Sequence, residues 1–146
     1  MNTLRNVLLA DDDADDRMLF RDVLNDLGMA VALKTVGDGV ELMELLHASA
    51  TLPDVLFLDF NMPKKDGLSC LREIKADERL SALPVVVFSN SDNPALVEMM
   101  LNEGASYFVR KQHGYNKTLK LITKLFALDK SVLAQKKEIY DFVIHT

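Results

Sequence analysis

Residues 6–13 read NVLLADDD and residues 55–59 read VLFLD, so two apolar runs each end abruptly on acidic residues. Continuous apolar runs of this length are typical of strands that are buried on both faces of a parallel sheet. Comparable runs lie at residues 30–36, 84–88 and 107–109. The sequence therefore predicts five buried strands.

Segments with helical spacing separate these runs. Apolar residues recur at helical spacing over residues 20–27, and Gly28 follows as a helix C-cap. Four more helices are expected around residues 42–46, over 67–76, from a cap at Asp92-Asn93-Pro94 to near Gly104, and over 117–128. The alternation predicts an α/β fold with a doubly wound, five-stranded parallel sheet flanked by five helices.

Length and composition are those of one compact domain. The chain has 146 residues, of which 49% are hydrophobic, and it contains no low-complexity stretch. No apolar run is long enough to span a membrane or to act as a secretory signal, so we expect a soluble, cytoplasmic protein. Cys70, the single cysteine, fits a reducing compartment. Its apolar helical context favours a core position over a reactive thiol.

Charge is distributed unevenly along the chain. The net charge of −5 disfavours nucleic acid as the default partner. Residues 110–146 hold eight Lys and Arg against three Asp and Glu, whereas residues 1–109 are strongly acidic. Five aspartates fall within residues 11–16. The acidity is therefore concentrated around the end of the first expected strand.

The carboxyl ends of the strands are where a doubly wound sheet binds its ligands. Asp11 and Asp12 end the first run and Asp59 ends the third, so three carboxylates are expected to meet there. Such carboxylates repel one another unless a cation neutralises their charge, and Mg²⁺ prefers oxygen ligands of this kind. Helix capping is the alternative use of these acids; we assign Asp15 and Asp16 to it, and Asp11 and Asp12 to the metal.

Asp59 closes an apolar strand that has no structural need for a charge. A carboxylate can act as a nucleophile towards a phosphoryl group, and such transfer depends mainly on positioning and charge neutralisation. Ser89 and Lys111 fall at the ends of the fourth and fifth runs, where they offer a hydroxyl and an ammonium group. Each residue alone is weak evidence, but together they predict a phosphoryl site.

Several motifs make residues 4–128 resemble the receiver domains of two-component response regulators, which have the flavodoxin-like fold of the chemotaxis response regulator. They are LLADDD at 8–13, LDFNMPKKDG at 58–67, PVVVFS at 84–89, and the segment from Gly104 to Lys111. The stretch after Asp59 most resembles single-domain regulators that work with phytochrome-type and hybrid kinases. We therefore expect a receiver domain over residues 1–128 and a C-terminal extension over 129–146, for which a helix is one expectation.

The resemblance implies roles for the acidic residues. Asp59 would be the phosphoacceptor, and Asp12 would bind Mg²⁺ directly. Asp11 would bind the same ion through water, and the backbone carbonyl of Asn61 would complete the protein ligands.

It also implies a set of switch residues. Ser89 would bind the phosphoryl group, Lys111 would pair with it, and Phe108 stands at the position of the aromatic rotamer switch, although a core position explains a Phe equally well. Asn61 and Ser91 lie where the family tunes the lifetime of the phosphoryl group.

Two positions depart from the family pattern. Gln112 replaces the proline that usually follows the lysine, often through a cis peptide, so either a trans bond with a reshaped loop or a strained cis bond is expected. Asn90, after the switch hydroxyl, is larger than usual; it would narrow access for the phosphodonor or contact the phosphoryl group itself.

The expected function is a phosphorylation-driven switch rather than an enzyme with an external substrate. A sensor histidine kinase or a phosphotransfer protein would donate to Asp59, and the response would pass to an unidentified protein target. A haloacid-dehalogenase-type phosphohydrolase is the enzyme alternative, but its chemistry requires a second acid at the position that Asn61 occupies. A docking module that does not depend on phosphorylation is the third reading, supported only by Gln112 and Asn90.

The tail is unusually apolar for a chain end. Ile139, Tyr140, Phe142, Val143 and Ile144 form a patch that should be buried. Packing on its own domain and pairing across a homodimer both satisfy this requirement, so a monomer and a homodimer both stay open.

Overall fold

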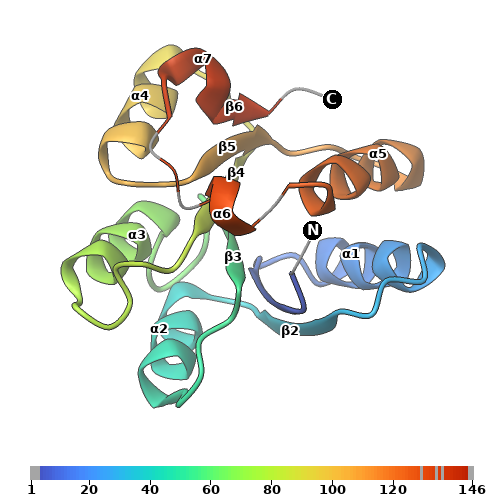
Figure 1. Ribbon diagram of the computed structural model, residues 1–146, viewed down its shortest axis with the longest axis horizontal. Helices are drawn as coiled ribbons and strands as arrows, with labels where there is room; N and C mark the ends of the chain where they lie inside the picture. Colours follow the sequence, from blue (N-terminus) through green and yellow to red (C-terminus); the bar gives the residue numbers. More distant parts are fainter. Residues whose placement is uncertain (1–3, 129, 134, 136, 145–146) are drawn as a thin grey trace.

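The computed structural model describes residues 4–128, 130–133, 135 and 137–144. Strands and helices alternate through the first 126 residues (Figure 1). The strands are β1 (Asn6–Ala10), β2 (Ala32–Val36), β3 (Val55–Asp59), β4 (Val85–Ser89), β5 (Tyr107–Arg110) and β6 (Val143–Ile144). The helices are α1 (Ala14–Asp26), α2 (Gly39–Ala48), α3 (Gly67–Ala76), α4 (Pro94–Asn102), α5 (Tyr115–Phe126), α6 (Lys130–Leu133) and α7 (Ile139–Phe142).

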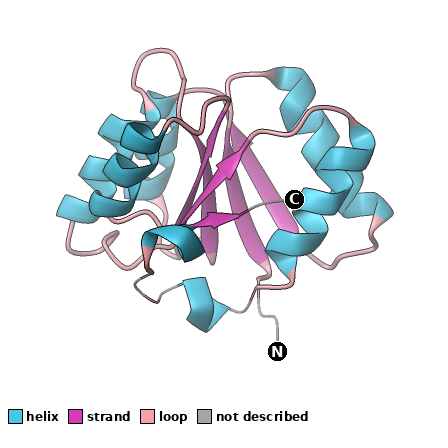
Figure 2. Ribbon diagram, turned by 90° about the horizontal axis from the view of Figure 1, so that it is seen from above, coloured by secondary structure: helices cyan, strands magenta, loops and turns pink. Residues whose placement is uncertain are grey.

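The strands form one parallel sheet in the order β2-β1-β3-β4-β5-β6. Helices cover both faces of this sheet (Figure 2). Helices α1 and α5 lie together on one face, and α2, α3 and α4 lie on the other (Figure 1). The predicted doubly wound α/β fold is therefore confirmed.

Each central strand contributes alternate residues to the two faces. Leu56 and Leu58 of β3 join the cluster beneath α2, α3 and α4. Phe57 points to the other face, where its ring centroid lies 5.5 Å from that of Phe20 in α1 and 6.0 Å from that of Phe126 in α5. Burial on both faces explains why these strands read as unbroken apolar runs.

The predicted boundaries differ slightly from those observed. The second strand begins at Ala32 rather than residue 30, because the N–H of Val31 bonds the carbonyl of Met29 in a tight turn. The fifth helix spans 115–126 rather than 117–128. Other signals were accurate: Gly28 takes a positive φ of 66° directly after the α1 C-cap, and Asn93 caps α4 with Pro94 in the first turn.

Cys70 occupies the core, as predicted. It is fully buried on α3, and this burial raises the pKa of its thiol to about 11. The thiol therefore remains protonated at neutral pH and is a poor nucleophile. No helix of the described residues is long and apolar enough to cross a membrane.

The tail adds a sixth strand to the five that the sequence predicts. In β6, Val143 and Ile144 pair in parallel with Phe108 and Val109 of β5. The side chain of Phe142, just before this strand, is fully buried, and its ring centroid lies 6.4 Å from that of Phe108. Of the two arrangements left open for the tail, the structure shows packing against its own domain. The side chains of Ile139 and Tyr140 lie outside the described residues.

Replacing the buried tail aromatic tests this packing. Phe142→Ala is expected to lower the free energy of unfolding by about 3 kcal/mol, because it leaves a cavity beside Phe108. Met18→Ala is the control: its side chain is 63% exposed, and a change of less than about 0.5 kcal/mol is expected. Urea unfolding measures both. An unchanged midpoint for Phe142→Ala would show that the tail does not stabilise the domain.

Candidate functional site

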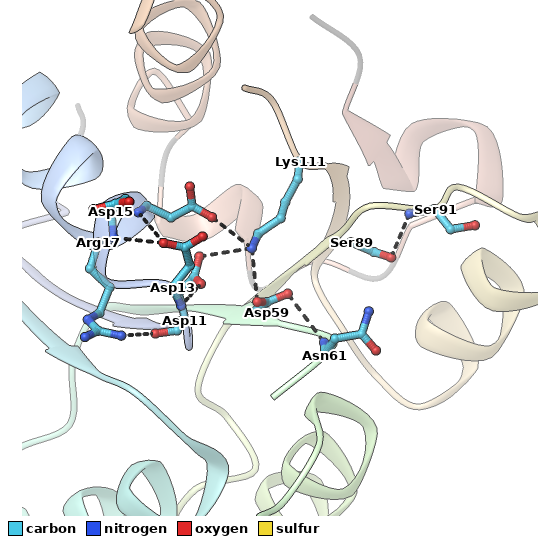
Figure 3. A network of polar contacts seen from close by, with 10 residues as sticks. Asp11, Asp13, Asp15, Arg17, Asp59, Asn61, Ser89, Ser91 and Lys111 are labelled. Carbon is cyan, nitrogen blue, oxygen red and sulfur yellow. Dashed lines mark hydrogen bonds and ion pairs between the residues drawn. The ribbon is translucent and has the colours of Figure 1, made fainter. Parts of the chain in front are cut away.

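The carboxyl ends of β1, β3, β4 and β5 meet at one edge of the sheet. The register places Ala10 beside Leu58, so Asp11 follows β1 next to the end of β3, which is Asp59. Across β4, Ser89 pairs with Arg110, and Lys111 follows at once. The predicted site residues are thereby gathered at one edge by the parallel sheet (Figure 3).

Lys111 lies at the centre of this edge. Its Nζ is 3.0 Å from Oδ2 of Asp59 and 3.2 Å from Oδ2 of Asp11. A third carboxylate, Oδ2 of Asp16, lies 3.3 Å away. The lysine side chain is only 10% exposed. One largely buried ammonium group thus faces three carboxylates, so the site carries an excess of negative charge.

Asp11, Asp12 and Asp59 form the group that could bind a metal ion. Each can offer one carboxylate oxygen so that all three oxygens lie within 4.8 Å of one another. Asp11 and Asp59 are buried and Asp12 is exposed, which leaves one side of the cluster open to solvent. Hard oxygen donors with this excess of negative charge fit a divalent cation such as Mg²⁺. The predicted set of three acids is therefore close in space.

Burial dominates the electrostatics of the two inner acids. It raises the pKa of Asp59 to about 6, although the nearby Lys111 acts in the opposite direction. Burial also raises the pKa of Asp11, against the hydrogen bond from the Asp13 N–H and the charge of Lys111. Burial acts to lower the pKa of Lys111, but Asp59 and Asp11 hold it above its ordinary value. At pH 7 and above, Asp59 is therefore mainly a carboxylate beside a charged ammonium.

The first turn of α1 is tied to the end of β1. Oδ1 of Asp13 caps the helix by accepting the N–H groups of Asp15 and Asp16. The N–H of Asp13 donates to Oδ1 of Asp11 at 2.9 Å, and Nη1 of Arg17 donates to the Asp11 carbonyl at 2.6 Å. Asp15 and Asp16 lie in the first turn as predicted, where they favour the helix dipole.

The other predicted residues lie near the site, and one of them, Asn61, contacts Asp59 through its backbone N–H. The Ser89 hydroxyl accepts the N–H of Ser91 at 3.1 Å and points away from Asp59 (Figure 3). Asn61 is exposed, and its N–H donates to Oδ1 of Asp59 at 3.4 Å. Phe108 is fully buried in the core. The hydroxyl of Ser89 therefore has to rotate before it can reach a group on Asp59.

The two departures from the family pattern have structural outcomes. The described residues contain no cis peptide, so the bond between Lys111 and Gln112 is trans. The side-chain amide of Gln112 donates from Nε2 to the Arg110 carbonyl at 3.1 Å. This hydrogen bond braces the backbone on both sides of Lys111. Asn90 is exposed.

Sequence reasoning missed two contacts of α1. Asp16 was assigned only to capping the helix and complementing its dipole, yet Asp13 is the N-cap and the Asp16 carboxylate contacts Lys111. Arg17 was not considered, yet it holds the backbone at Asp11. A signal was present for Asp16: with Asp13 as N-cap, it is the third helical residue, in the turn nearest the strand ends.

A doubly wound parallel sheet with three acids and a lysine at the carboxyl ends of its strands is the arrangement that the sequence resemblance implies for a receiver domain. The chain belongs to the response regulator receiver domain family, which matches residues 7–123. Members of this family bind a divalent metal and receive signals from histidine kinases or phosphotransfer proteins. The match places the chain in a signalling family rather than among phosphohydrolases.

Two named proteins illustrate the sequence similarity to this chain. The chain is 30% identical to chemotaxis protein CheY1 of Helicobacter pylori over 105 residues, which are 72% of this chain and 83% of that protein. It is 34% identical to response regulator Rcp1 of Synechocystis over 97 residues, covering 63% of this chain and 66% of Rcp1.

Solved structures agree with these relationships. The phosphorylated cyanobacterial phytochrome response regulator RcpA superposes with a TM-score of 0.77 at 30% identity, covering 84% of this chain and 91% of RcpA. The Mn²⁺-bound form of Rcp1 gives a TM-score of 0.75 at 28% identity, covering 83% and 91%. The resemblance to receiver domains, including those of phytochrome regulators, is confirmed.

Removing the buried charge of Asp59 is expected to stabilise the metal-free protein at alkaline pH. The folded pKa of about 6 lies above the ordinary value of 3.8, so the folded state binds more protons than the unfolded chain between these pH values. Stability from this group is therefore gained as the pH falls and lost as it rises through about 6.

Asp59→Asn should raise the free energy of unfolding at pH 8 in EDTA by about 1 to 2 kcal/mol, after allowance for solvent screening. The difference from wild type should shrink as the pH falls from 8 to 4. Urea unfolding at several pH values measures it. A variant that is less stable than wild type at pH 8 would contradict this account.

Proposed function

We propose that this chain is a phosphorylation-driven signalling switch whose phosphoacceptor is Asp59. The observation that carries the proposal is the position of this carboxylate. It is 4% exposed at the end of β3, lies 3.0 Å from the ammonium of Lys111, and belongs to the group of three acids. The chemotaxis protein CheY1 and Rcp1, a response regulator by name, support the same reading.

The chemistry requires little from the protein beyond positioning. A carboxylate oxygen of Asp59 attacks the phosphorus atom of a phosphohistidine, the new O–P bond forms, and the N–P bond breaks. The electron pair of that bond returns to the imidazole nitrogen, which takes a proton from solvent. Lys111 balances the negative charge that gathers on the phosphoryl oxygens.

Asp11, Asp12 and Asp59 would bind Mg²⁺, with the backbone carbonyl of Asn61 as a further ligand. We assign Asp12 to direct contact and Asp11 to contact through water. Bound there, Mg²⁺ would supply charge neutralisation on the phosphoryl oxygens. The Mn²⁺-bound form of Rcp1 supports a divalent site in a relative.

Residues of the neighbouring strands would then respond to the added phosphoryl group. Ser89 would turn its hydroxyl from Ser91 towards the phosphoryl oxygens, and Lys111 would pair with them. Phe108 would respond from the core, at the point where it packs against Phe142. Asn61 and Ser91 would tune the lifetime of the phosphoryl group.

Asn90 would act as an accessory residue at the entrance. It is exposed directly after Ser89, where it would narrow access for an incoming phosphodonor or contact the phosphoryl group itself.

The partners follow from the same chemistry. The donor would be a sensor histidine kinase or a phosphotransfer protein, and the receiver would act on a protein target in the cytoplasm, as a monomer or a homodimer. Residues 1–128 would form the receiver unit and residues 129–146 an extension at its β5 edge. The only reactions catalysed would be phosphorylation and dephosphorylation of Asp59 itself.

Phosphoryl uptake tests the central claim. Incubation of the wild type with Mg²⁺ and ³²P-labelled acetyl phosphate is expected to label the protein with a hydroxylamine-sensitive acyl phosphate. Asp59→Asn should take up no label, whereas Asp22→Asn, an exposed site on α1, should label like the wild type. A wild type without label, or an Asp59→Asn variant with equal label, would refute the proposal.

Metal binding has a separate test. Mg²⁺ at 100 times its dissociation constant should stabilise the wild type by about 2.7 kcal/mol, because only the folded state binds it. Asp12→Asn should weaken Mg²⁺ binding about tenfold or more, while Asp15→Asn changes it little. Thermal unfolding across a Mg²⁺ titration measures both. Equal shifts for the two variants would remove Asp12 from the ligand set.

A further inference from the structure

The ammonium of Lys111 has three carboxylate neighbours that differ in their other contacts. Asp11 and Asp59 also belong to the group of three acids whose oxygens lie within 4.8 Å of one another. Asp16 lies outside that group, on α1, and its Oδ2 is 3.3 Å from Nζ of Lys111. It is thus the one neighbour of the three that has no place in the metal group.

We propose that Asp16 is a positioning residue that anchors Lys111 at the phosphoryl site while the other partners of the lysine change. This inference rests on the proposed phosphoacceptor function of Asp59. It adds a residue, and a helix, to the set that determines how the domain binds a phosphoryl group.

The need for such an anchor follows from the chemistry at Asp59. When a phosphoryl group is attached, one Asp59 oxygen becomes part of an acyl phosphate and loses its full charge. The contact of 3.0 Å between Lys111 and Asp59 must then be remade with phosphoryl oxygens. The contact with Asp16 need not change, because nothing is bonded to its carboxylate in either state.

The place of Asp16 is fixed by the same strand end that bears the acids. Its N–H donates to Oδ1 of Asp13 at 3.3 Å, and the N–H of Asp13 donates to Oδ1 of Asp11 at 2.9 Å. Arg17 adds its hydrogen bond to the Asp11 carbonyl. These bonds hold the first turn of α1 against the end of β1, so the Asp16 carboxylate is presented from a rigid support.

Lys111 is the kind of residue that benefits from an anchor. Its stem has four rotatable bonds, and lysine is among the side chains that lose most rotamer freedom when they are ordered. Gln112 braces only the backbone, through the Arg110 carbonyl. The ammonium itself is held by carboxylates, and Asp16 approaches it from α1 whereas Asp11 and Asp59 approach from strand ends.

Asp15→Asn provides a matched control. Asp15 and Asp16 are neighbours in the same helical turn, and the N–H of each bonds Oδ1 of Asp13. Asp15 is exposed, and Lys111 bonds Asp16 rather than Asp15. The two Asn variants remove the same charge from the same turn, so a difference between them reports the contact with Lys111.

The first measurement detects the anchor in the metal-free protein. The NMR signal of the Lys111 ammonium, assigned with Lys111→Arg, should be visible in the wild type and in Asp15→Asn because the group is held by carboxylates. Asp16→Asn should broaden or shift it. An unchanged signal in Asp16→Asn would overturn the anchoring role.

The second measurement tests the consequence for phosphoryl binding. Beryllofluoride, which mimics a phosphoryl group on a carboxylate, is titrated at saturating Mg²⁺ and followed by amide NMR. Asp16→Asn should bind it about three- to fivefold more weakly than Asp15→Asn, the range of a partly exposed ion pair. Asp16→Glu, which keeps the charge, should bind it more tightly than Asp16→Asn.

Equal affinities for the two Asn variants, or no gain from Asp16→Glu over Asp16→Asn, would overturn the proposal. Failure of the phosphoacceptor function is distinguishable from this result. In that case the wild type itself would bind no beryllofluoride and take up no label, whatever the ammonium signal shows.

Discussion

The structure depends on the free-energy cost of holding buried carboxylates close together at the carboxyl ends of the strands. Asp11 and Asp59 are each only 4% exposed, and burial raises the pKa of both. Lys111 compensates for part of this cost by contacting both carboxylates and Asp16. One ammonium cannot neutralise so many acids, so the site is poised to accept further positive charge. Much of the function follows from this excess of negative charge.

The parallel sheet makes this arrangement possible with short local signals. Because the strands of the sheet run in the same direction, one or two residues at the carboxyl end of each of β1, β3, β4 and β5 are enough to build the site. The helices then cover the apolar faces, and Phe57 packs between β3 and the pair α1 and α5. The first turn of α1 has a second task, because its cap at Asp13 bonds the carboxylate of Asp11. Fold and site therefore share the same residues at the end of β1.

The sequence predicted those features that depend on local pattern. The five long strands, the cap at Asn93 and the close approach of Asp11, Asp12 and Asp59 follow from apolar runs and their polar ends. The position of Asp16 in the first turn was predictable, but its contact with Lys111 was missed because it also depends on how α1 packs beside the strand ends. The strand β6 was missed because two residues are too few to show a periodicity. Likewise, the direction of the Ser89 hydroxyl is a choice of rotamer, which composition does not determine.

The tail also changes what the edge strands of the sheet expose to other chains. An unpaired edge strand offers free N–H and C=O groups on which a strand of another chain can assemble. Beside β5, the chain's own Val143 and Ile144 occupy that position. At the opposite side of the sheet, the edge strand β2 carries the exposed charge of Lys34. The two sides are thus protected by different means, one by self-pairing and one by charge, and both oppose strand-to-strand aggregation.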